Sequence, residues 1–278
     1  MRIAAILTCH NRKQKTLDCL KSLYEIVKDI DVFLTDDRST DGTGEEVSNR
    51  FPNVKIIHGS GNLFWSRGMY TAWKEAIKKD YEYYLWLNDD VKLYSDFFTE
   101  LFDCLHWGGN TCIVTGLIEN EERRQVIYGG SDENKKLIQP SPIPQLVTYM
   151  NGNVVLVPKT VVDKIGIIDP VYHHDLGDVD YGLTAKENGI KVYATRKAVA
   201  MGYSNNFCRV RKWNTNLRGR FERLYSPLGA NPQINFYYRH KHFGYFNALS
   251  YILFLYAINI LPDTVIELLF KDKYKDEK

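Results

Sequence analysis

Residues 83–94 read YYLWLNDDVKLY, an apolar run that breaks at Asn88-Asp89-Asp90 and resumes at Val91. Tyr83–Leu87 has the length and apolar composition of a buried β-strand. Adjacent carboxylates repel each other, and burying them beside a core costs free energy unless a positive group compensates. The stretch therefore predicts a strand that ends in an acidic site, and the charge of this site requires a cationic partner.

Three similar runs precede this strand. They are expected as strands at Ile3–Thr8, Val32–Thr35 and Val54–His58, and the segments between them place apolar residues at helical spacing. Alternating strands and helices predict a parallel sheet with right-handed crossovers, which binds ligands beyond the C-terminal ends of its strands. Polar residues stand at those ends, namely Thr8, Asp36-Asp37 and Asn88-Asp89-Asp90.

The chain after residue 110 is less regular. Strands are expected at Cys112–Leu117, Asn153–Val157, Lys191–Ala194 and Ala198–Met201, and helices at Lys159–Ile165 and Asp178–Asn188. Together these elements predict an α/β fold, in which helices flank a Rossmann-like, mostly parallel central sheet.

The composition is that of an ordinary globular protein, because 44% of the 278 residues are hydrophobic and 25% are charged. A net charge of +2 does not indicate a nucleic-acid partner. The five cysteines form no CxxC pair, so neither a zinc site nor a disulfide framework is predicted, and a reducing compartment is favoured. The N-terminal MRIAAILTCHNR turns polar too soon for a signal peptide. We therefore expect a cytoplasmic protein.

The C-terminal region has a different character. Residues 244–270 carry only two charged side chains, Asp263 and Glu267, and follow the basic and aromatic segment YYRHKHFGYF at 237–246. Three alternatives are open: a helical hairpin packed on the domain, a segment docked on a membrane surface, and a spanning helix. A spanning helix needs ~20 predominantly apolar residues, and Pro262 interrupts this run. Basic and aromatic segments are typical of lipid headgroup surfaces.

Two acidic clusters at strand ends suit binding chemistry. Asp89 and Asp90 could hold Mg²⁺ or Mn²⁺, which prefer carboxylate, water and phosphate oxygens, although a solvated turn or a helix cap is the alternative. Asp36 and Asp37 lie within LTDDRSTDGT at 34–43. Capping of the next helix does not require these two carboxylates, because Ser39, Thr40 and Asp41 already suit the turn and the N-cap. Asp36 and Asp37 could accept hydrogen bonds from a nucleobase or a ribose, and a purely structural role is the alternative.

A third acidic cluster lies in HHDLGDVDYGLTAKENG at 173–189. Asp178 and Asp180 stand near a helix start, where they either compensate the helix dipole or supply a general base. His173 and His174 could be a base, metal ligands or simply polar residues. Arg67, at another helix start in GNLFWSRGM, is a candidate for an anion or base contact, with a surface ion pair as the alternative.

Six segments in this order resemble inverting family 2 glycosyltransferases of the GT-A fold. They are AILTCHNR, FLTDDRSTDGT, GNLFWSRGM, LWLNDDV, MNGNVVLVPKTVVDKIGIID and GDVDYGLTAKENGIKVY. The resemblance is to the branch of rhamnosyl- and galactosyltransferases that build bacterial cell-surface polysaccharides. It implies a catalytic GT-A domain at 1–205 and leaves 206–278 as a basic, aromatic, helical extension that faces the acceptor or a membrane.

The resemblance implies roles for the residues at matching positions. For the nucleotide these are Thr8, Asp36, Asp37, Arg67 and Asp89, and for a Mg²⁺ or Mn²⁺ cofactor Asp90. For the donor sugar they are Asn151, Gly152 and Asn153, and we add Asp180 and His174 from the third acidic cluster as candidates for contact with the donor sugar or the acceptor. Asp178 matches the second residue of the family's Glu-Asp signature and is the implied catalytic base.

Three positions depart from the family's pattern. Asn88 begins the so-called DxD motif in place of an aspartate, and Gly177 occupies the glutamate position of the Glu-Asp signature. Met201 stands where many relatives have a metal-binding histidine, and a thioether is a poor ligand for Mg²⁺ or Mn²⁺.

The function implied by the resemblance is transfer of a hexose from a UDP-, dTDP- or GDP-sugar to a hydroxyl of a glycan or lipid-linked saccharide. The cation would neutralise the departing diphosphate, and Asp178 would deprotonate the acceptor in a single displacement that inverts the anomeric centre. The alternatives are a non-catalytic module that binds nucleotide-sugars or glycans, and a nucleotidyltransferase. A lipid-linked acceptor would place the protein peripherally on the cytoplasmic face of the membrane.

Overall fold

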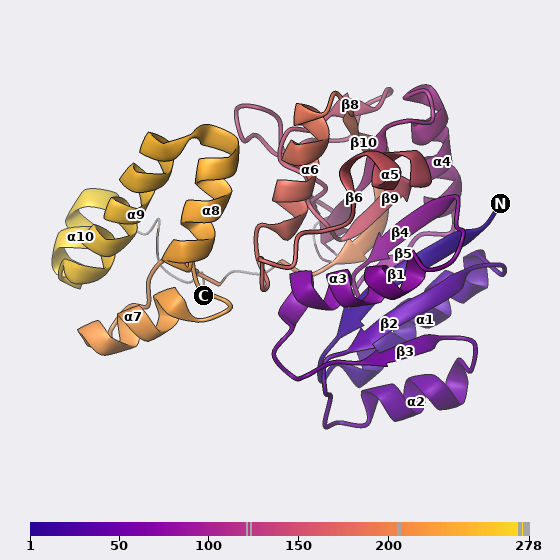
Figure 1. Cartoon of the computed structure of the whole chain (residues 1–278), viewed down its shortest axis with the longest axis horizontal. Coiled ribbons are helices and arrows are strands. Elements are labelled where there is room, and N and C mark those ends of the chain that lie inside the picture. Colours follow the sequence, from indigo (N-terminus) through magenta and orange to yellow (C-terminus); the bar gives the residue numbers. More distant parts are fainter. Residues whose placement is uncertain (121, 123, 205–206, 272–273, 275–278) are drawn as a thin grey trace. The chain divides into compact units, whose positions relative to one another are not determined.

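The computed structural model describes residues 1–120, 122, 124–204, 207–271 and 274, which form two compact units (Figure 1). The first unit contains residues 1–170 and 176–204. The second contains Val171–Asp175 and the chain from residue 205 onward.

The first unit is built on one sheet, which has ten strands in the described part of the chain. The main path of hydrogen-bonded neighbours runs β3-β2-β1-β4-β9-β6-β10-β5, while β7 pairs with β6 and β8 with β10. The strands are β1 Ile3–Cys9, β2 Asp31–Asp36, β3 Lys55–His58, β4 Tyr83–Leu87, β5 Lys92–Leu93, β6 Ile113–Asn120, β7 Val126–Tyr128, β8 Gln145–Leu146, β9 Val154–Pro158 and β10 Val192–Gly202.

The α/β fold and the central sheet are confirmed, and the sheet is mixed. Strands β3, β2, β1 and β4 run parallel, as the alternation of strands and helices predicts. Strand β9 is antiparallel to both of its neighbours, β4 and β6, and β10 is again parallel to β6. Beyond β4 the order of elements along the chain therefore no longer gives the strand direction.

The expectation of two short strands near residues 191–201 is wrong, because β10 is continuous. Its pairing with β6 shifts register between Ala194 and Ala198. Within this irregularity the hydroxyl of Thr195 accepts the N–H of Leu117 at 2.9 Å and donates to the carbonyl of Lys197 at 2.8 Å. Across the bulge, the hydrogen bonds of the Thr195 side chain thus take the place of backbone hydrogen bonds between the strands, and β10 continues through it.

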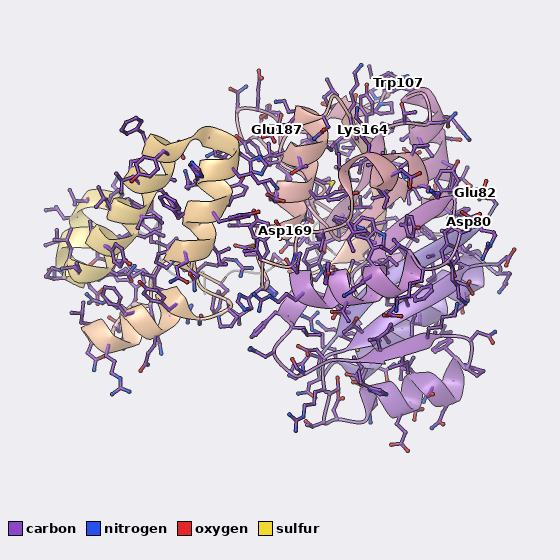
Figure 2. All side chains as sticks on the ribbon, viewed as in Figure 1. Asp80, Glu82, Trp107, Lys164, Asp169 and Glu187 are labelled. Atoms are coloured by element: carbon purple, nitrogen blue, oxygen red, sulfur yellow. The ribbon has the colours of Figure 1, made fainter. Side chains whose placement is uncertain are left out.

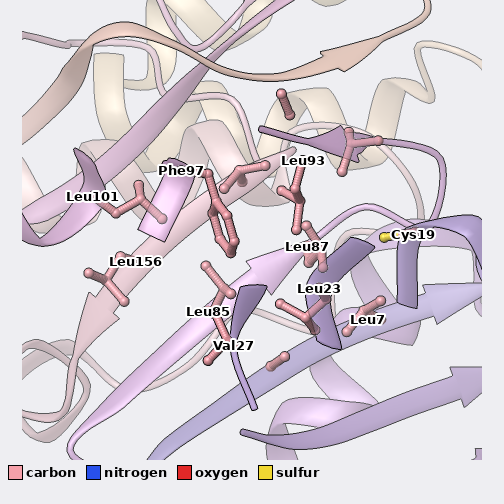
Figure 3. Close-up of a cluster of buried hydrophobic side chains, with 14 of the residues drawn as sticks. Leu7, Cys19, Leu23, Val27, Leu85, Leu87, Leu93, Phe97, Leu101 and Leu156 are labelled. Carbon is pink, nitrogen blue, oxygen red and sulfur yellow. The ribbon is translucent and has the colours of Figure 1, made fainter. Parts of the chain in front are cut away.

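Helices cover both faces of the sheet, because alternate strand residues point to opposite sides. On one face Leu7, Leu85 and Leu87 pack with Leu23 (Figure 3), and Leu20 belongs to the same cluster. On the other, residues of β1 and β4 pack with the apolar side of α3. The first face carries α1 Lys13–Ile26, α2 Thr43–Arg50 and α4 Phe97–Trp107, and the second α3 Phe64–Ala76, α5 Lys159–Ile165 and α6 Gly177–Glu187.

Acidic residues lie at both ends of β4, but only one end bears the polar cluster. Asp80 and Glu82 precede the strand and lie at the outer edge of the first unit (Figure 2). Asp89 and Asp90 follow it, at the edge where β1 and β2 also end. The candidate site is therefore at the C-terminal edge of the parallel strands, as expected for this topology.

The second unit is helical. It contains α7 Leu217–Tyr225, α8 Pro232–Phe243, α9 Tyr245–Ile260 and α10 Asp263–Phe270. The apolar run at 244–270 thus forms two helices that are separated at Leu261-Pro262. Among the described residues, we find no helix with the length and hydrophobicity needed to cross a bilayer.

Two arginines of the basic segment are structural. Arg211 is fully buried and donates to the carbonyls of Ile258 and Leu261, which α9 leaves unpaired at its end. Arg211 and Arg220 both pair with Asp263 at the start of α10. These arginines hold the break between α9 and α10, so the excess of basic residues in this region is partly internal rather than a surface charge.

Candidate functional site

The ends of β2, β1 and β4 are neighbours in the sheet, as predicted. Their parallel register pairs Cys9 with Asp36 and Ile6 with Trp86, which brings the residues after these strands to one edge. Three carboxylates there, those of Asp36, Asp37 and Asp89, belong to residues no more than 6% exposed. Each needs a hydrogen-bond or charge partner, because a buried unpaired carboxylate is costly.

Asp89 and Asp90 share one cationic partner, the guanidinium of Arg12. A single nitrogen, Nη1, lies 3.0 Å from Oδ1 of Asp89 and 2.7 Å from Oδ2 of Asp90. The hydroxyl of Thr16 also donates to Oδ2 of Asp89 at 3.2 Å. Burial raises the pKa of Asp89 to about 6, although the attraction of Arg12 opposes the shift. Within the protein, Arg12 is therefore the cation that the two carboxylates require.

The sequence analysis missed Arg12. The residue is 77 positions from Asp89, and it enters the site because it caps α1 directly after β1. Its carbonyl accepts the N–H of Thr16 at 3.0 Å, so the first turn of the helix holds it in place. The available signal was topological: a basic residue in the loop after β1 lies at the same sheet edge as the residues after β4.

The carboxylates of Asp36 and Asp37 shape the neighbouring loops. Asp36 accepts the N–H of Ser39 at 2.9 Å. Asp37 accepts three backbone N–H groups within 3.1 Å, those of Gly61, Leu63 and Phe64. Asp37 thus fixes the loop that enters α3, and a nucleotide contact by either carboxylate stays a prediction.

Thr8 and Arg67 also have structural partners. The hydroxyl of Thr8 donates to the carbonyl of Thr35 at 3.2 Å, and a Cβ added to Gly68 would lie 2.2 Å from that hydroxyl. Gly68 therefore lets α3 approach the end of β1 closely. Arg67 donates from Nε to the carbonyl of Pro170 at 2.9 Å, and its proposed contact with the nucleotide is untested.

The hydrogen bonds of Asn88 explain why this position departs from the family's pattern. Its amide joins two groups that an aspartate could not join. Its Oδ1 accepts the indole N–H of Trp65 at 2.7 Å, while its Nδ2 donates to Oδ1 of Asn153 at 2.6 Å. Asn153 in turn donates from Nδ2 to Oδ1 of Asn151. The amide thereby connects the acidic pair to the Asn151-Gly152-Asn153 loop, and a carboxylate, which only accepts, would break this relay.

We expect Asn88→Asp to lower the free energy of unfolding by about 1–3 kcal/mol, since it leaves Oδ1 of Asn153 without its donor and adds a third carboxylate beside Asp89 and Asp90. Urea unfolding measures the change. Asn62→Asp, at an exposed position of the neighbouring loop, is the matched control and should leave stability unchanged. Equal stabilities of the two variants would contradict the relay.

Asp178 is held at the start of α6. Its Oδ2 accepts the N–H of Gly152 at 2.9 Å and its Oδ1 the N–H of Val179 at 2.8 Å. A Cβ added to Gly152 would lie 2.5 Å from the ring of Trp65 and 3.1 Å from Cβ of Asp178. The structure therefore brings together Asp178, the Gly152 loop and the Asn88 relay.

Gly177 has a steric reason for replacing the family's glutamate. A Cβ at this position would lie 2.5 Å from Oγ of Ser66, a fully buried residue near the start of α3. The starts of α3 and α6 thus approach too closely for a side chain at 177. The site lacks the second carboxylate because of this packing.

Two further predicted residues belong to α6 and to the second unit. Asp180 is buried in the first turn of α6, and its N–H donates to the carbonyl of Leu176. His174 belongs to the second unit. Their proposed roles toward the donor sugar or the acceptor stay predictions.

The residues suit a cation that shares its ligands with a diphosphate. No group of three His, Cys, Asp or Glu suited to a metal ion occurs in the described part of the chain. Met201 lies beside Arg124, whose Nη1 is 3.6 Å from its sulfur, so position 201 offers no ligand for Mg²⁺ or Mn²⁺. Asp90 is one-quarter exposed, and Arg12 bonds only its Oδ2. Oδ1 of Asp90 can therefore supply one ligand, and the others must come from the substrate and water.

Comparison with known proteins gives a family and a fold. Residues 4–162 match the family model described as "Glycosyl transferase family 2". The chain is similar to a crystal structure of S. aureus TarS 1–349, with a TM-score of 0.53 and 16% identity over 74% of this chain and 61% of that one. A crystal structure of TarS 1–349 in complex with UDP-GlcNAc gives a TM-score of 0.57 and 13% identity over 97% and 76%. No curated protein matches the sequence.

Proposed function

The chain belongs to glycosyl transferase family 2, and we propose that it moves a hexose from a nucleoside-diphosphate sugar to a hydroxyl of a glycan or lipid-linked saccharide. The observation that carries the proposal is the continuous network at the C-terminal sheet edge. It runs from the Arg12-bridged pair Asp89-Asp90 through Asn88 to the loop that holds Asp178. A donor diphosphate at the pair and an acceptor hydroxyl at Asp178 would meet across this loop.

On the donor side, we assign the nucleotide to the edge formed by the loops after β1 and β2. Asp36 and Asp37 hold these loops through backbone N–H groups, and Thr8 lies beneath them against α3. Arg67 would add positive charge, and Asp89 would line the ribose side. The family and the similarity to a TarS structure that contains UDP-GlcNAc favour a UDP-sugar as the first candidate.

A bound Mg²⁺ or Mn²⁺ would neutralise charge on the departing diphosphate. The residue that would hold the cation is Asp90, through the carboxylate oxygen that Arg12 does not bond. Arg12 bonds the other oxygen of this carboxylate, so Asp90 is oriented before the donor arrives.

On the acceptor side, we assign the general base to Asp178. Two backbone N–H groups orient its carboxylate, and it lies in the first turn of α6, where the helix dipole favours the ionised form. The carboxylate would take the proton of the acceptor hydroxyl as the oxygen attacks the anomeric carbon from the face opposite the diphosphate. A single displacement inverts that carbon, and we assign the chain to the rhamnosyl- and galactosyltransferase branch on its motifs.

Calorimetry with UDP-, dTDP- and GDP-sugars, in Mn²⁺ and then in excess chelator, tests the proposal. We expect one nucleotide class to bind, with an affinity that falls when the metal is removed. Binding that is indifferent to metal would overturn the role of Asp90. The absence of binding across the panel would overturn the assignment of a nucleotide-sugar donor.

A further inference from the structure

The position of Arg12 has a consequence for cation binding. One nitrogen of its guanidinium lies within 3.0 Å of both Asp89 and Asp90. A divalent cation that bridged these carboxylates would need the same place. While Arg12 occupies it, the only oxygen of the pair without a hydrogen-bond partner among the described residues is Oδ1 of Asp90.

The charges of the site point in the same direction. Two carboxylates and one guanidinium leave a single net negative charge, whereas the pair alone would carry two. A divalent cation that approaches Asp90 is attracted by the carboxylates and repelled by the guanidinium, which is itself in contact with Asp90. Arg12 therefore weakens cation binding to the nucleotide-free site in two ways: its charge repels the cation, and its guanidinium occupies the position between the carboxylates.

We propose that Arg12 makes cation binding conditional on the nucleotide, by holding the Asp89-Asp90 pair closed to a divalent cation until a donor diphosphate brings further negative charge and oxygen ligands. The inference rests on the proposed function and adds to it a residue that orders the binding steps. Arg12 acts as a positioning residue, because its contacts are with the carboxylates.

The two carboxylates differ in how readily they can give up Arg12. The side chain of Asp89 is 6% exposed, so loss of its charge partner would leave a buried carboxylate unpaired. The side chain of Asp90 is 24% exposed and can be compensated by a cation and water instead. Arg12 therefore stays with Asp89, and Asp90, whose Oδ1 it does not bond, is the carboxylate that turns to the cation when the diphosphate arrives.

Manganese binding, followed by the electron paramagnetic resonance signal of free Mn²⁺, tests the inference without relying on activity. Wild-type protein should bind Mn²⁺ weakly alone and at least about tenfold more tightly with UDP. Arg12→Gln should bind Mn²⁺ at least about tenfold more tightly than wild type when UDP is absent, because the bridging place opens and one positive charge is lost. The gain produced by UDP should shrink accordingly.

The controls separate this inference from the proposed function. Arg50→Gln removes a surface guanidinium paired with Glu46 and should leave Mn²⁺ affinity unchanged. If wild type binds UDP with Mn²⁺ but Arg12→Gln gains no nucleotide-free affinity, the inference is wrong and the proposed function stands. If wild type binds no nucleotide in the calorimetric panel, the proposed function fails, whatever Arg12→Gln does.

A second variant covers the case in which Arg12→Gln does not fold. Asp90→Asn should leave nucleotide-free Mn²⁺ binding as weak as in wild type and should remove the gain produced by UDP. Strong nucleotide-free binding in wild type that Asp90→Asn abolishes would show that Arg12 does not keep the cation out, and would overturn the inference.

Discussion

Asp178→Asn should lower turnover about 10²–10⁴-fold while it leaves donor affinity within about twofold of wild type. An amide of nearly the same shape can still accept the N–H of Gly152, so the loop should stay in place. It cannot take the acceptor proton at neutral pH, and the step that needs a base is lost. Turnover and binding should therefore separate in this variant.

The reaction can be followed before the acceptor is known. Slow hydrolysis of the donor by water releases the nucleoside diphosphate, and the same base would activate the water. Asp163→Asn is a suitable control, because Asp163 forms an exposed ion pair with Lys159 on α5. If Asp178→Asn hydrolyses the donor as fast as wild type, another residue is the base. If the variant loses donor binding together with hydrolysis, Asp178 is a structural residue.

Local patterns were enough to predict the part of the site that lies on parallel strands. The ends of β1, β2 and β4 each show a polar residue after an apolar run, and parallel strands bring such ends to one edge. The same reasoning could not give β9, which is antiparallel to β4 and β6, although it comes directly before a helix, as the parallel strands β1 and β2 do. Strand direction there depends on tertiary pairing rather than on the local sequence.

Side-chain partners were the least predictable feature of the site. The pairing of Arg12 with Asp89 and Asp90 joins residues far apart in sequence, so the sequence analysis assigned the missing positive charge to a metal ion. Gly177 and Asn88 looked like losses of carboxylates. The structure explains both, through the close approach of Ser66 and through the need for an amide that donates as well as accepts.

For the basic segment of the second unit, the sequence analysis overestimated the surface charge. Counting charges treats every arginine alike, yet Arg211 and Arg220 are buried against Asp263 and the end of α9. Lys212 and Arg218 are exposed, and a further exposed group lies at the turn between α8 and α9. We call this the aromatic tip, formed by Lys241, Phe243, Tyr245 and Phe246.

The aromatic tip has the composition of a surface that docks on lipid. The side chain of Phe246 is 85% exposed, and Leu249 and Leu253 continue its face along α9 at helical spacing. Aromatic residues beside a lysine suit the headgroup region of an anionic bilayer. We propose that the tip binds the membrane that carries a lipid-linked acceptor.

Replacing both aromatic residues, in Tyr245→Ser/Phe246→Ser, should weaken binding to anionic phospholipid vesicles about 100-fold. Full burial of an apolar side chain contributes about 1.5–3 kcal/mol, so the partial burial of two rings at an interface accounts for about 3 kcal/mol. Lys241→Ala should cost about 1 kcal/mol on anionic vesicles and nothing on zwitterionic ones. Co-sedimentation of the full chain with vesicles measures both effects.

Leu268→Ser is the matched control, because Leu268 is 84% exposed on α10 and lies outside the tip. It should bind vesicles as wild type does, which separates docking by the tip from general stickiness of exposed apolar residues. Equal losses in the control and the double variant would contradict the assignment of the tip. Vesicle binding that all the variants retain would leave the exposed aromatic residues to a protein partner, and the acceptor would then have to reach Asp178 without the membrane.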